Sequence, residues 1–194
     1  MPTGVALRDP RDQLFAAAER LLLRTGPTAL TSRAVTAEAG CAKGVLHRYF
    51  TDFDDFLAEL VLDRIARLDT GSAELRAAAG TGTVADNLAA AMIDLFETVA
   101  VAIVGLVIFR DELRIRLRRT TPVGVPLLTE ATAMITEYLA AERELGRLPK
   151  DIDIDALAPT VIGAAHLLFA DRQAEPPSQA AVRRMVRTVL GEAR

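Results

Sequence analysis

The sequence predicts an all-α fold, and three observations support that prediction. Apolar side chains recur every three or four residues along successive segments, as on one face of a helix. Gly and Pro residues punctuate these segments, as they do at helix ends. Of the 194 residues, 51% are hydrophobic but only 5% are aromatic, a composition that suits packed helices with a core of Ala, Leu, Val and Ile. The alternation over residues 151–155 resembles a strand, but the sequence offers it no partner strand.

The first helix is predicted over residues 12–24. Gly26 and Pro27 follow directly and are expected to end it. Its apolar positions share one face and are Leu14, Ala18, Leu21 and Leu22.

Two shorter helices are predicted next. Thr31 is placed to cap the first of them, and Gly40 tolerates the positive φ of a helix end. The second must be short, because a break follows soon after Phe50. Lys43 is expected in its first turn, while Leu46 and Phe50 anchor it in the core.

A fourth, longer helix is expected to begin after Asp52, which together with Asp55 resembles a capping box. Gly80–Thr83 then predicts a flexible break. Further helices are expected over residues 84–98, 99–119, 127–145, 155–171 and 177–190.

Within these later helices, three residues carry specific expectations. Gly105 is the expected weak point of the segment 99–119, which is either one helix or a bent continuation of the one before it. Pro159 is expected in a first turn, where it is tolerated, and Ser178 is expected to cap the last helix.

The short helix near residue 46 has the residue types of a DNA-reading element. Lys43, His47, Arg48 and Tyr49 surround its apolar anchors, and such a helix suits entry into a major groove. The chain has a net charge of −3, but residues 24–50 carry four basic side chains and one acidic one. The positive field is therefore local, and few phosphate contacts are expected.

These residues resemble the amino-terminal DNA-binding domain of the TetR family of transcriptional regulators. The resemblance covers about residues 8–68 without an insertion. The residues that carry it are Gly26, Thr31, Arg33, Val35, Glu38, Ala39, Gly40, Lys43, Gly44, Leu46, Tyr49, Phe50, Asp54 and Asp55.

The resemblance implies two domains and a regulatory function. A three-helix DNA-binding domain with a helix-turn-helix is expected over residues 1–52, and a helical ligand-binding and dimerisation domain over residues 53–194. The implied function is a ligand-responsive repressor, released from a palindromic operator on double-stranded DNA by a small hydrophobic or amphipathic effector. The implied assembly is a homodimer in which the last two large helices pair across a two-fold axis.

The resemblance also implies which residues meet DNA. Arg48 is expected to read a base, since its guanidinium can make two hydrogen bonds to guanine, and Tyr49 is expected to bind a phosphate. His47 is left between a phosphate and a base contact. The full predicted set is Thr31, Arg33, Lys43, Gly44, Val45, His47, Arg48 and Tyr49.

Three positions depart from the family pattern, and together they are expected to weaken the hold on phosphates. One of them is Val45, which stands where a Thr is frequent. Ala42 stands where a capping Ser is usual, and Phe53 stands where a phosphate-binding Lys is common. The change at Ala42 also costs about 1 kcal/mol of helix stability.

A small-molecule pocket is expected among the fourth to eighth helices and is expected to be mostly apolar. Its candidate lining residues are Met92, Phe96, Ile103, Val107, Phe109, Met134 and Tyr138. Asp94 lies in an apolar stretch, where a carboxylate either lines a pocket or lies on the polar side of its helix. The arginines between Arg110 and Arg119 are either favourable cations near a helix end or a site for an acidic head group.

Other functional classes have less support. His166 lies on an apolar face and is interpreted as a core or interface histidine, and Cys41 as a small core residue rather than a redox sensor. Two His and one Cys at scattered positions provide no metal set, no cofactor is expected, and no catalytic constellation supports a helical enzyme. A helical protein–protein interaction module that keeps the helix-turn-helix as scaffold remains the alternative.

The sequence also bears on location. No secretory signal is visible, and the longest apolar stretch, residues 99–109, suits a buried helix better than a membrane span. A single cysteine fits a reducing compartment. A cytoplasmic protein with no membrane partner is therefore expected.

Overall fold

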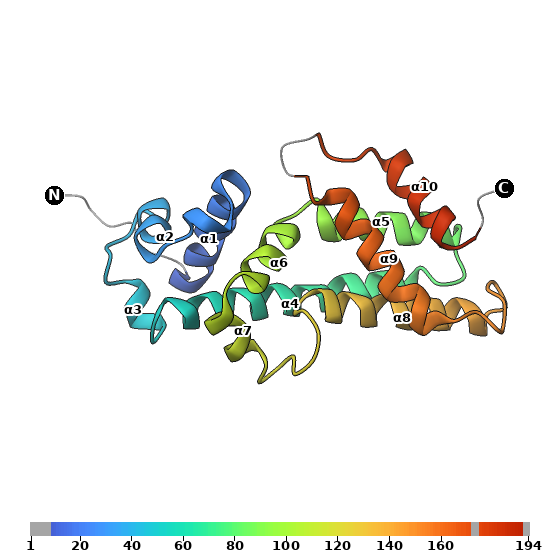
Figure 1. Cartoon of the computed structure of the whole chain (residues 1–194), viewed down its shortest axis with the longest axis horizontal. Coiled ribbons are helices and arrows are strands. Elements are labelled where there is room, and N and C mark those ends of the chain that lie inside the picture. The colour runs from blue at the N-terminus through green and yellow to red at the C-terminus, as the bar shows by residue number, and fades with distance from the viewer. Residues whose placement is uncertain (1–8, 172–174, 192–194) are drawn as a thin grey trace. The chain divides into compact units, whose positions relative to one another are not determined.

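The computed structural model describes residues 9–171 and 175–191. Within these ranges the chain forms ten α-helices and one short 3-10 helix, and no strand (Figure 1). The prediction of an all-α fold is confirmed. The chain divides into two compact units. The first consists of residues up to 63 and residues 102–125. The second consists of residues 64–101 and the residues from 126 onward. The first unit thus extends past the predicted domain boundary at residue 52.

The first unit begins with a series of short helices. They are α1 (Pro10–Thr25), η1 (Pro27–Ala29), α2 (Ser32–Glu38), α3 (Leu46–Tyr49) and the start of α4 (Phe53–Ala77). The Asp9 carboxylate caps α1 by accepting hydrogen bonds from the backbone N–H groups of Arg11 and Asp12, and Gly26, with φ of 79°, ends it. The first helix therefore starts two residues earlier than predicted.

Aromatic side chains hold the first unit together. The rings of Phe15, Phe50 and Phe56 meet at centroid distances of 5.1 to 5.9 Å, and all three are buried. Because these residues come from α1, the end of α3 and the start of α4, their contacts fix the short α3 against its two longer neighbours. Burial of such large rings contributes about 1.5–3 kcal/mol each.

The segment 102–125 completes the first unit with most of α6 (Ala100–Ile108) and with α7 (Asp111–Leu117). The expected weak point at Gly105 is wrong, since Gly105 lies inside α6 and the break falls at Phe109 and Arg110. A Cβ at Gly105 would lie 3.9 Å from Pro27 Cγ, an ordinary van der Waals distance, so this position neither bends the helix nor requires a glycine. Arg110 adopts an extended backbone, with φ of −127°, and directs its side chain to Asp54.

The second unit contains the remainder of α4 and four further helices. They are α5 (Val84–Phe96), α8 (Leu128–Glu144), α9 (Ile154–Phe169) and α10 (Gln179–Val189). Helix α10 packs on α5 and α9, and α9 packs on α8. The side chains of Thr83, Asp153 and Ser178 each accept a hydrogen bond at the start of a helix, as predicted for Ser178. Pro159 is the sixth residue of α9, so its predicted place in the first turn is wrong.

A buried polar network joins α8 to the turn between α4 and α5. Tyr138 Oη donates a hydrogen bond to Glu142 Oε1 at 2.6 Å, and Asn87 Nδ2 donates to Tyr138 Oη at 3.0 Å. Glu142 Oε1 also accepts from the N–H of Gly80 at 3.3 Å. Arg147 Nη1 lies 3.4 Å from Glu142 Oε2, close enough for an ion pair but without hydrogen-bond geometry. The glycines of this turn allow many backbone conformations, and the hydrogen bonds of the network hold the turn in one of them.

Among the described residues, no single helix is long and apolar enough to cross a membrane. Helices α5 and α6 together have the length and composition of a span, but they are two separate helices joined at a bend.

Candidate nucleic-acid interface and ligand cavity

Glu38 anchors the helix-turn-helix to α1. Its carboxylate accepts hydrogen bonds from Arg20 Nε at 2.9 Å and from Arg24 Nη2 at 2.6 Å. These hydrogen bonds, first that from Arg24 and then that from Arg20, lower the pKa of Glu38 to about 2. Two arginines one turn apart on α1 therefore hold the last residue of α2 in its ionised form.

The turn between α2 and α3 follows from its residues. Thr31 Oγ1 caps α2 by accepting from the N–H of Ala34 at 3.1 Å, as predicted. Gly40 has φ of 66°, which confirms the expected positive φ after α2. The N–H of Cys41 then donates to Thr36 O at 3.0 Å. Partial burial raises the pKa of the Cys41 thiol, which disfavours the reactive thiolate.

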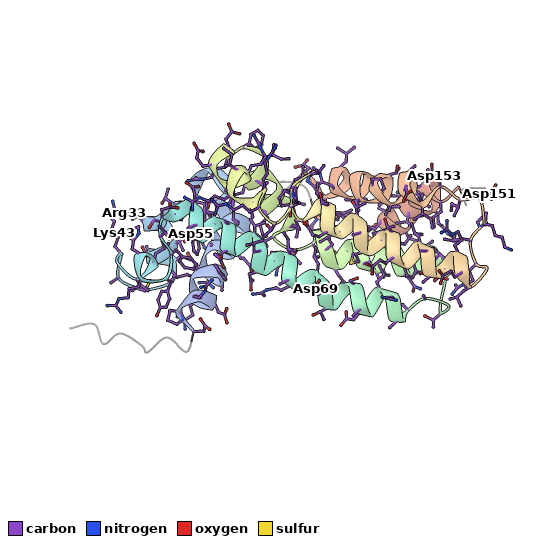
Figure 2. The ribbon with its side chains drawn as sticks, turned by 90° about the horizontal axis from the view of Figure 1, so that it is seen from below. Arg33, Lys43, Asp55, Asp69, Asp151 and Asp153 are labelled. Atoms are coloured by element: carbon purple, nitrogen blue, oxygen red, sulfur yellow. The ribbon has the colours of Figure 1, made fainter. Side chains whose placement is uncertain are left out.

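The segment formed by α2, the following turn and α3 exposes most of the residues that were predicted to meet DNA. Leu46 and Phe50 are buried, and Val45 is half-buried. The other seven members of the predicted set are exposed, and Arg33 and Lys43 project from the surface of this segment in Figure 2. They are Thr31, Arg33, Lys43, Gly44, His47, Arg48 and Tyr49.

The expected place of Lys43 is wrong, because α3 begins only at Leu46 and Lys43 lies in the preceding turn. The N–H of Val45 donates to Ala42 O at 2.9 Å, so the chain already turns at Ala42. No side chain caps α3. Ala42 has no hydroxyl that could cap this turn.

The start of α4 is capped by two aspartates. Asp52 Oδ1 accepts from the N–H of Asp55 at 2.8 Å, and Asp55 Oδ2 accepts from the N–H of Thr51 at 2.8 Å. The predicted capping box is thus present, with its return bond one residue earlier than in the standard motif. The N–H of Asp55, and then Arg116, lower the pKa of Asp52.

Arginines of α7 and of the residue before it contact this start of α4. Arg116 Nη2 lies 2.5 Å from Asp52 Oδ2, and Arg110 Nε lies 2.5 Å from Asp54 Oδ1. Arg114 instead pairs with Asp111 on its own helix. Three of the arginines between Arg110 and Arg119 therefore already have carboxylate partners, and all belong to the first unit. The sequence could not indicate these pairs, because their members lie 56 and 64 residues apart.

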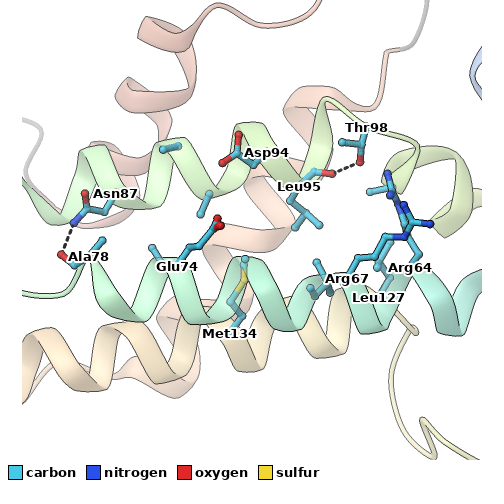
Figure 3. A pocket seen from close by; sticks show the side chains of 16 residues that line it. Arg64, Arg67, Glu74, Ala78, Asn87, Asp94, Leu95, Thr98, Leu127 and Met134 are labelled. Atoms are coloured by element: carbon cyan, nitrogen blue, oxygen red, sulfur yellow. Dashed lines mark hydrogen bonds between the residues drawn. The ribbon is translucent and has the colours of Figure 1, made fainter.

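A cavity of about 370 Å³ lies in the second unit (Figure 3). Its walls come mainly from α4 and α5, with Met134 from α8. Its apolar lining consists of leucines, alanines and Met134. The charged side chains are Arg64 and Arg67, and Glu74 facing Asp94 across the cavity. The lining residues are Arg64, Arg67, Leu68, Gly71, Glu74, Leu75, Ala78, Asn87, Ala90, Ala91, Asp94, Leu95, Thr98, Ala100, Leu127 and Met134.

The cavity differs from the predicted pocket in its lining. Of the seven predicted residues, Met134 alone lines it. Met92, Phe96 and Tyr138 fill the core of the second unit. The other three, Ile103, Val107 and Phe109, lie in the segment 102–125 of the first unit, where Phe109 is 87% exposed and the other two are buried. The largest apolar side chains pack against each other, and the cavity is left beside small residues such as Ala90 and Ala91.

Two further side chains can now be placed. Asp94 lines the cavity and is also exposed to solvent. It therefore lies both at a pocket and on the polar side of its helix, the two possibilities that the sequence left open. His166 packs edge-on against Phe96, with ring centroids 5.9 Å apart, and does not line the cavity. Burial lowers the pKa of His166, which favours its neutral form.

Comparisons with known proteins agree with this arrangement. Residues 14–60 match the model of the family described as "Bacterial regulatory proteins, tetR family". No curated protein matches the chain. The fold resembles that of the fatty acid degradation regulator FadR from Bacillus halodurans, with 18% identity, 98% of this chain and 99% of that chain covered, and a TM-score of 0.70.

Two further solved structures share the fold. The reduced form of E. coli NemR is 18% identical, with 95% of each chain covered and a TM-score of 0.68. FadR from Bacillus subtilis, in complex with stearoyl-CoA, is 18% identical, with 93% of this chain and 95% of that chain covered and a TM-score of 0.61.

The segment that matches the family model contains the helix-turn-helix and the exposed side chains of α3. Residues 14–60 therefore resemble the DNA-binding domain of TetR-family regulators, and the whole chain shares the fold of solved structures of such regulators.

Proposed function

We propose that the protein is a dimeric repressor that leaves a palindromic operator when a small amphipathic or hydrophobic molecule binds its second unit. The observation that carries the DNA-binding part is the exposure of Lys43, His47, Arg48 and Tyr49 beside the buried Leu46. A short helix held by apolar anchors, with donor side chains outward, has the form of a major-groove reader. Such a protein acts in the cytoplasm, where bacterial DNA is found.

The dimer is proposed to form through α9 and α10. One face of α9 is exposed and carries Ala156, Thr160, Gly163 and Leu167, at the spacing of a helix stripe. Leu167 is 77% exposed, and a Cβ at Gly163 would meet no other atom within 4 Å. Small residues along such a stripe allow a second helix to approach closely, and an exposed leucine gains from being covered.

The effector is proposed to occupy the cavity in the second unit. Its volume is within the usual range for ligand sites, roughly 300–1,000 Å³. Leu68, Leu95 and Met134 would hold an apolar body, and Arg64 with Arg67 would meet an anionic end. This replaces one of the two alternatives left open by the sequence, in which arginines between Arg110 and Arg119 hold the anionic group.

The release step is proposed as a population shift. An effector that binds better to one arrangement of the dimer increases the population of that arrangement. If the favoured arrangement no longer matches the spacing of successive major grooves, the two copies of α3 cannot both dock. The effector needs no contact with DNA for this result.

The test is a mobility shift with the DNA that flanks the protein's own gene. The wild-type protein is expected to give a discrete complex, while Arg48→Ala gives a weaker one at the same concentration. Protein purified without removal of bound small molecules is then analysed by mass spectrometry, and any compound found is added back to the complex.

A complex that persists in saturating compound removes the release step. A wild-type protein that binds no DNA favours the alternative, a protein–protein interaction module with the helix-turn-helix as scaffold. The departures at Ala42 and Phe53 are the sequence features that support this alternative.

A further inference from the structure

Three carboxylates stand at the start of α4, directly after the proposed DNA-reading helix. Asp52 precedes α4 and caps it, while Asp54 and Asp55 lie in its first turn. Each is half-buried, and each is paired with an arginine of the segment 102–125. Arg116 contacts Asp52 at 2.5 Å and Asp55 at 3.9 Å, and Arg110 contacts Asp54 at 2.5 Å.

Arg110 is held in a second way. Its guanidinium carbon lies 5.5 Å from the centroid of the Phe53 ring, within range of a cation–π contact. Its side chain is 35% exposed, and the Asp54 side chain is 23% exposed. The guanidinium therefore sits between an aromatic face and a carboxylate, and both fix it at the first turn of α4.

These carboxylates are close to the place where DNA would bind. Tyr49 and Asp52 are three residues apart, so their Cα atoms are separated by at most about 11 Å. The Debye length is about 8 Å at physiological salt and about 30 Å at 0.01 M, so charges at this separation are partly screened at physiological salt and interact clearly at low salt. Unpaired carboxylates here would repel the phosphates that Tyr49 and its neighbours are proposed to approach.

We infer that Arg110 and Arg116 belong to the DNA-binding apparatus, in which they neutralise Asp52, Asp54 and Asp55 and so permit phosphates to approach the start of α4. They are positioning residues, since they act through the aspartates and need not touch DNA. The inference rests on the proposed function. It explains why acidic residues that are useful as helix caps can stand next to a DNA-binding surface.

The first test is Arg116→Gln, with Arg114→Gln as its matched control. Both changes remove one positive charge from α7, but Arg114 pairs with Asp111 on its own helix and not with the carboxylates of α4. DNA affinity is measured by fluorescence anisotropy with two short duplexes, one of mixed sequence and one that covers the DNA flanking the protein's own gene.

Arg116→Gln is expected to weaken binding to both duplexes by roughly three- to tenfold at low salt, and less at high salt, because a screened charge is responsible. Arg114→Gln is expected to have a much smaller effect. Equal losses in the two variants would mean that only the net charge of the protein matters, and would overturn the inference.

The second test separates neutralisation from packing. Asn caps helices as well as Asp does, so Asp52→Asn keeps the cap while it removes the charge. The double variant Asp52→Asn/Arg116→Gln lacks the Arg116–Asp52 ion pair but keeps the wild-type net charge, and it is expected to regain most of the wild-type affinity. If the double variant stays as weak as Arg116→Gln, the arginine acts by holding α7 in place, and the inference is wrong.

Arg116→Lys is the third test. It keeps the positive charge and is therefore expected to retain most of the DNA affinity. Unfolding curves for every variant confirm that the compared proteins are folded. A wild-type protein that binds neither duplex would refute the proposed function itself. A wild-type protein that binds, with Arg116→Gln binding equally tightly, would refute this inference alone.

Discussion

Tyr138 and Glu142 lie one turn apart on α8 and share a hydrogen bond of 2.6 Å, with both side chains fully buried. Burial and the neighbouring carboxylate raise the pKa of Tyr138 well above its usual range, so the phenol stays protonated and remains a donor. Through Asn87 and Gly80, this pair fixes the turn that joins α4 to α5.

Tyr138→Phe is expected to destabilise the protein by about 1–3 kcal/mol, because Glu142 loses a donor where water cannot replace it. Chemical denaturation monitored by circular dichroism measures the change. The chain has only one other tyrosine, the exposed Tyr49, and Tyr49→Phe is the matched control that should leave stability unchanged. A Tyr138→Phe protein as stable as the wild type would show that the network adds nothing.

Glu38→Gln is expected to make thermal stability less dependent on acid pH. The folded-state pKa of Glu38 is depressed to about 2, so its stabilising effect is fully present above the unfolded-state value of about 4.5 and is lost as pH falls towards 2. The melting temperatures of the two proteins should therefore differ at pH 7 and converge as the pH falls from about 4.5 towards 2. Glu97→Gln, at an exposed carboxylate of α5, serves as control and should show no such convergence.

Arg48→Ala and Tyr49→Phe are expected to affect DNA binding differently. Loss of Arg48 should relax preference at one base pair of each half-site, with a cost of roughly 1–3 kcal/mol there. Loss of the Tyr49 hydroxyl should weaken binding to all sequences alike, because a phosphate contact carries no base information. Affinities for a set of single-base operator variants distinguish the two, and identical profiles would remove Arg48 from base reading.

Ala42→Ser is expected to stabilise the first unit. The chain turns at Ala42 without a side-chain cap, and a hydroxyl there can accept from the N–H groups that follow. A gain of about 0.5–1 kcal/mol is typical for such a cap. Ala37→Ser, at an exposed position inside α2, is the comparison and should not stabilise. If both serines have the same effect, the turn at Ala42 does not need a cap.

Ala91→Leu is expected to weaken binding of a fluorescent fatty acid, since Ala91 lines the cavity and a larger side chain occupies its volume. Ala133→Leu makes the same change at an exposed position on α8 outside the cavity, and binding should be unaffected. Repeating the titration with the methyl ester of the same acid tests whether Arg64 and Arg67 attract a negative charge. Equal affinity for acid and ester would remove these arginines from the site.

Local signals in the sequence were enough for most of the helices. Thr31 and Ser178 cap as predicted, and Gly40 adopts the positive φ that its position required, because caps and turns depend on a few neighbouring residues. The break after α6 was missed for the opposite reason. Arg110 leaves the helix to reach Asp54, and a contact 56 residues away leaves no mark in local periodicity.

The lining of the candidate cavity could not be predicted from local sequence signals either. Large apolar residues such as Met92 and Phe96 were chosen as lining, yet these are the side chains that pack most completely and leave no space. A cavity forms where packing fails, beside small residues such as Ala91 and at polar edges such as Asp94. Helix periodicity identifies the buried face but does not indicate where along that face the packing is incomplete.

The pairing of Glu38 with Arg20 and Arg24 has a consequence for selectivity. One carboxylate restrains two guanidinium groups beside the helix-turn-helix, so its removal would leave an additional positive charge next to the DNA-binding surface. Attraction to phosphates without regard to sequence would rise, while the fold itself became weaker at neutral pH. Glu38 therefore affects two properties of the domain, its stability and its selectivity for DNA sequence.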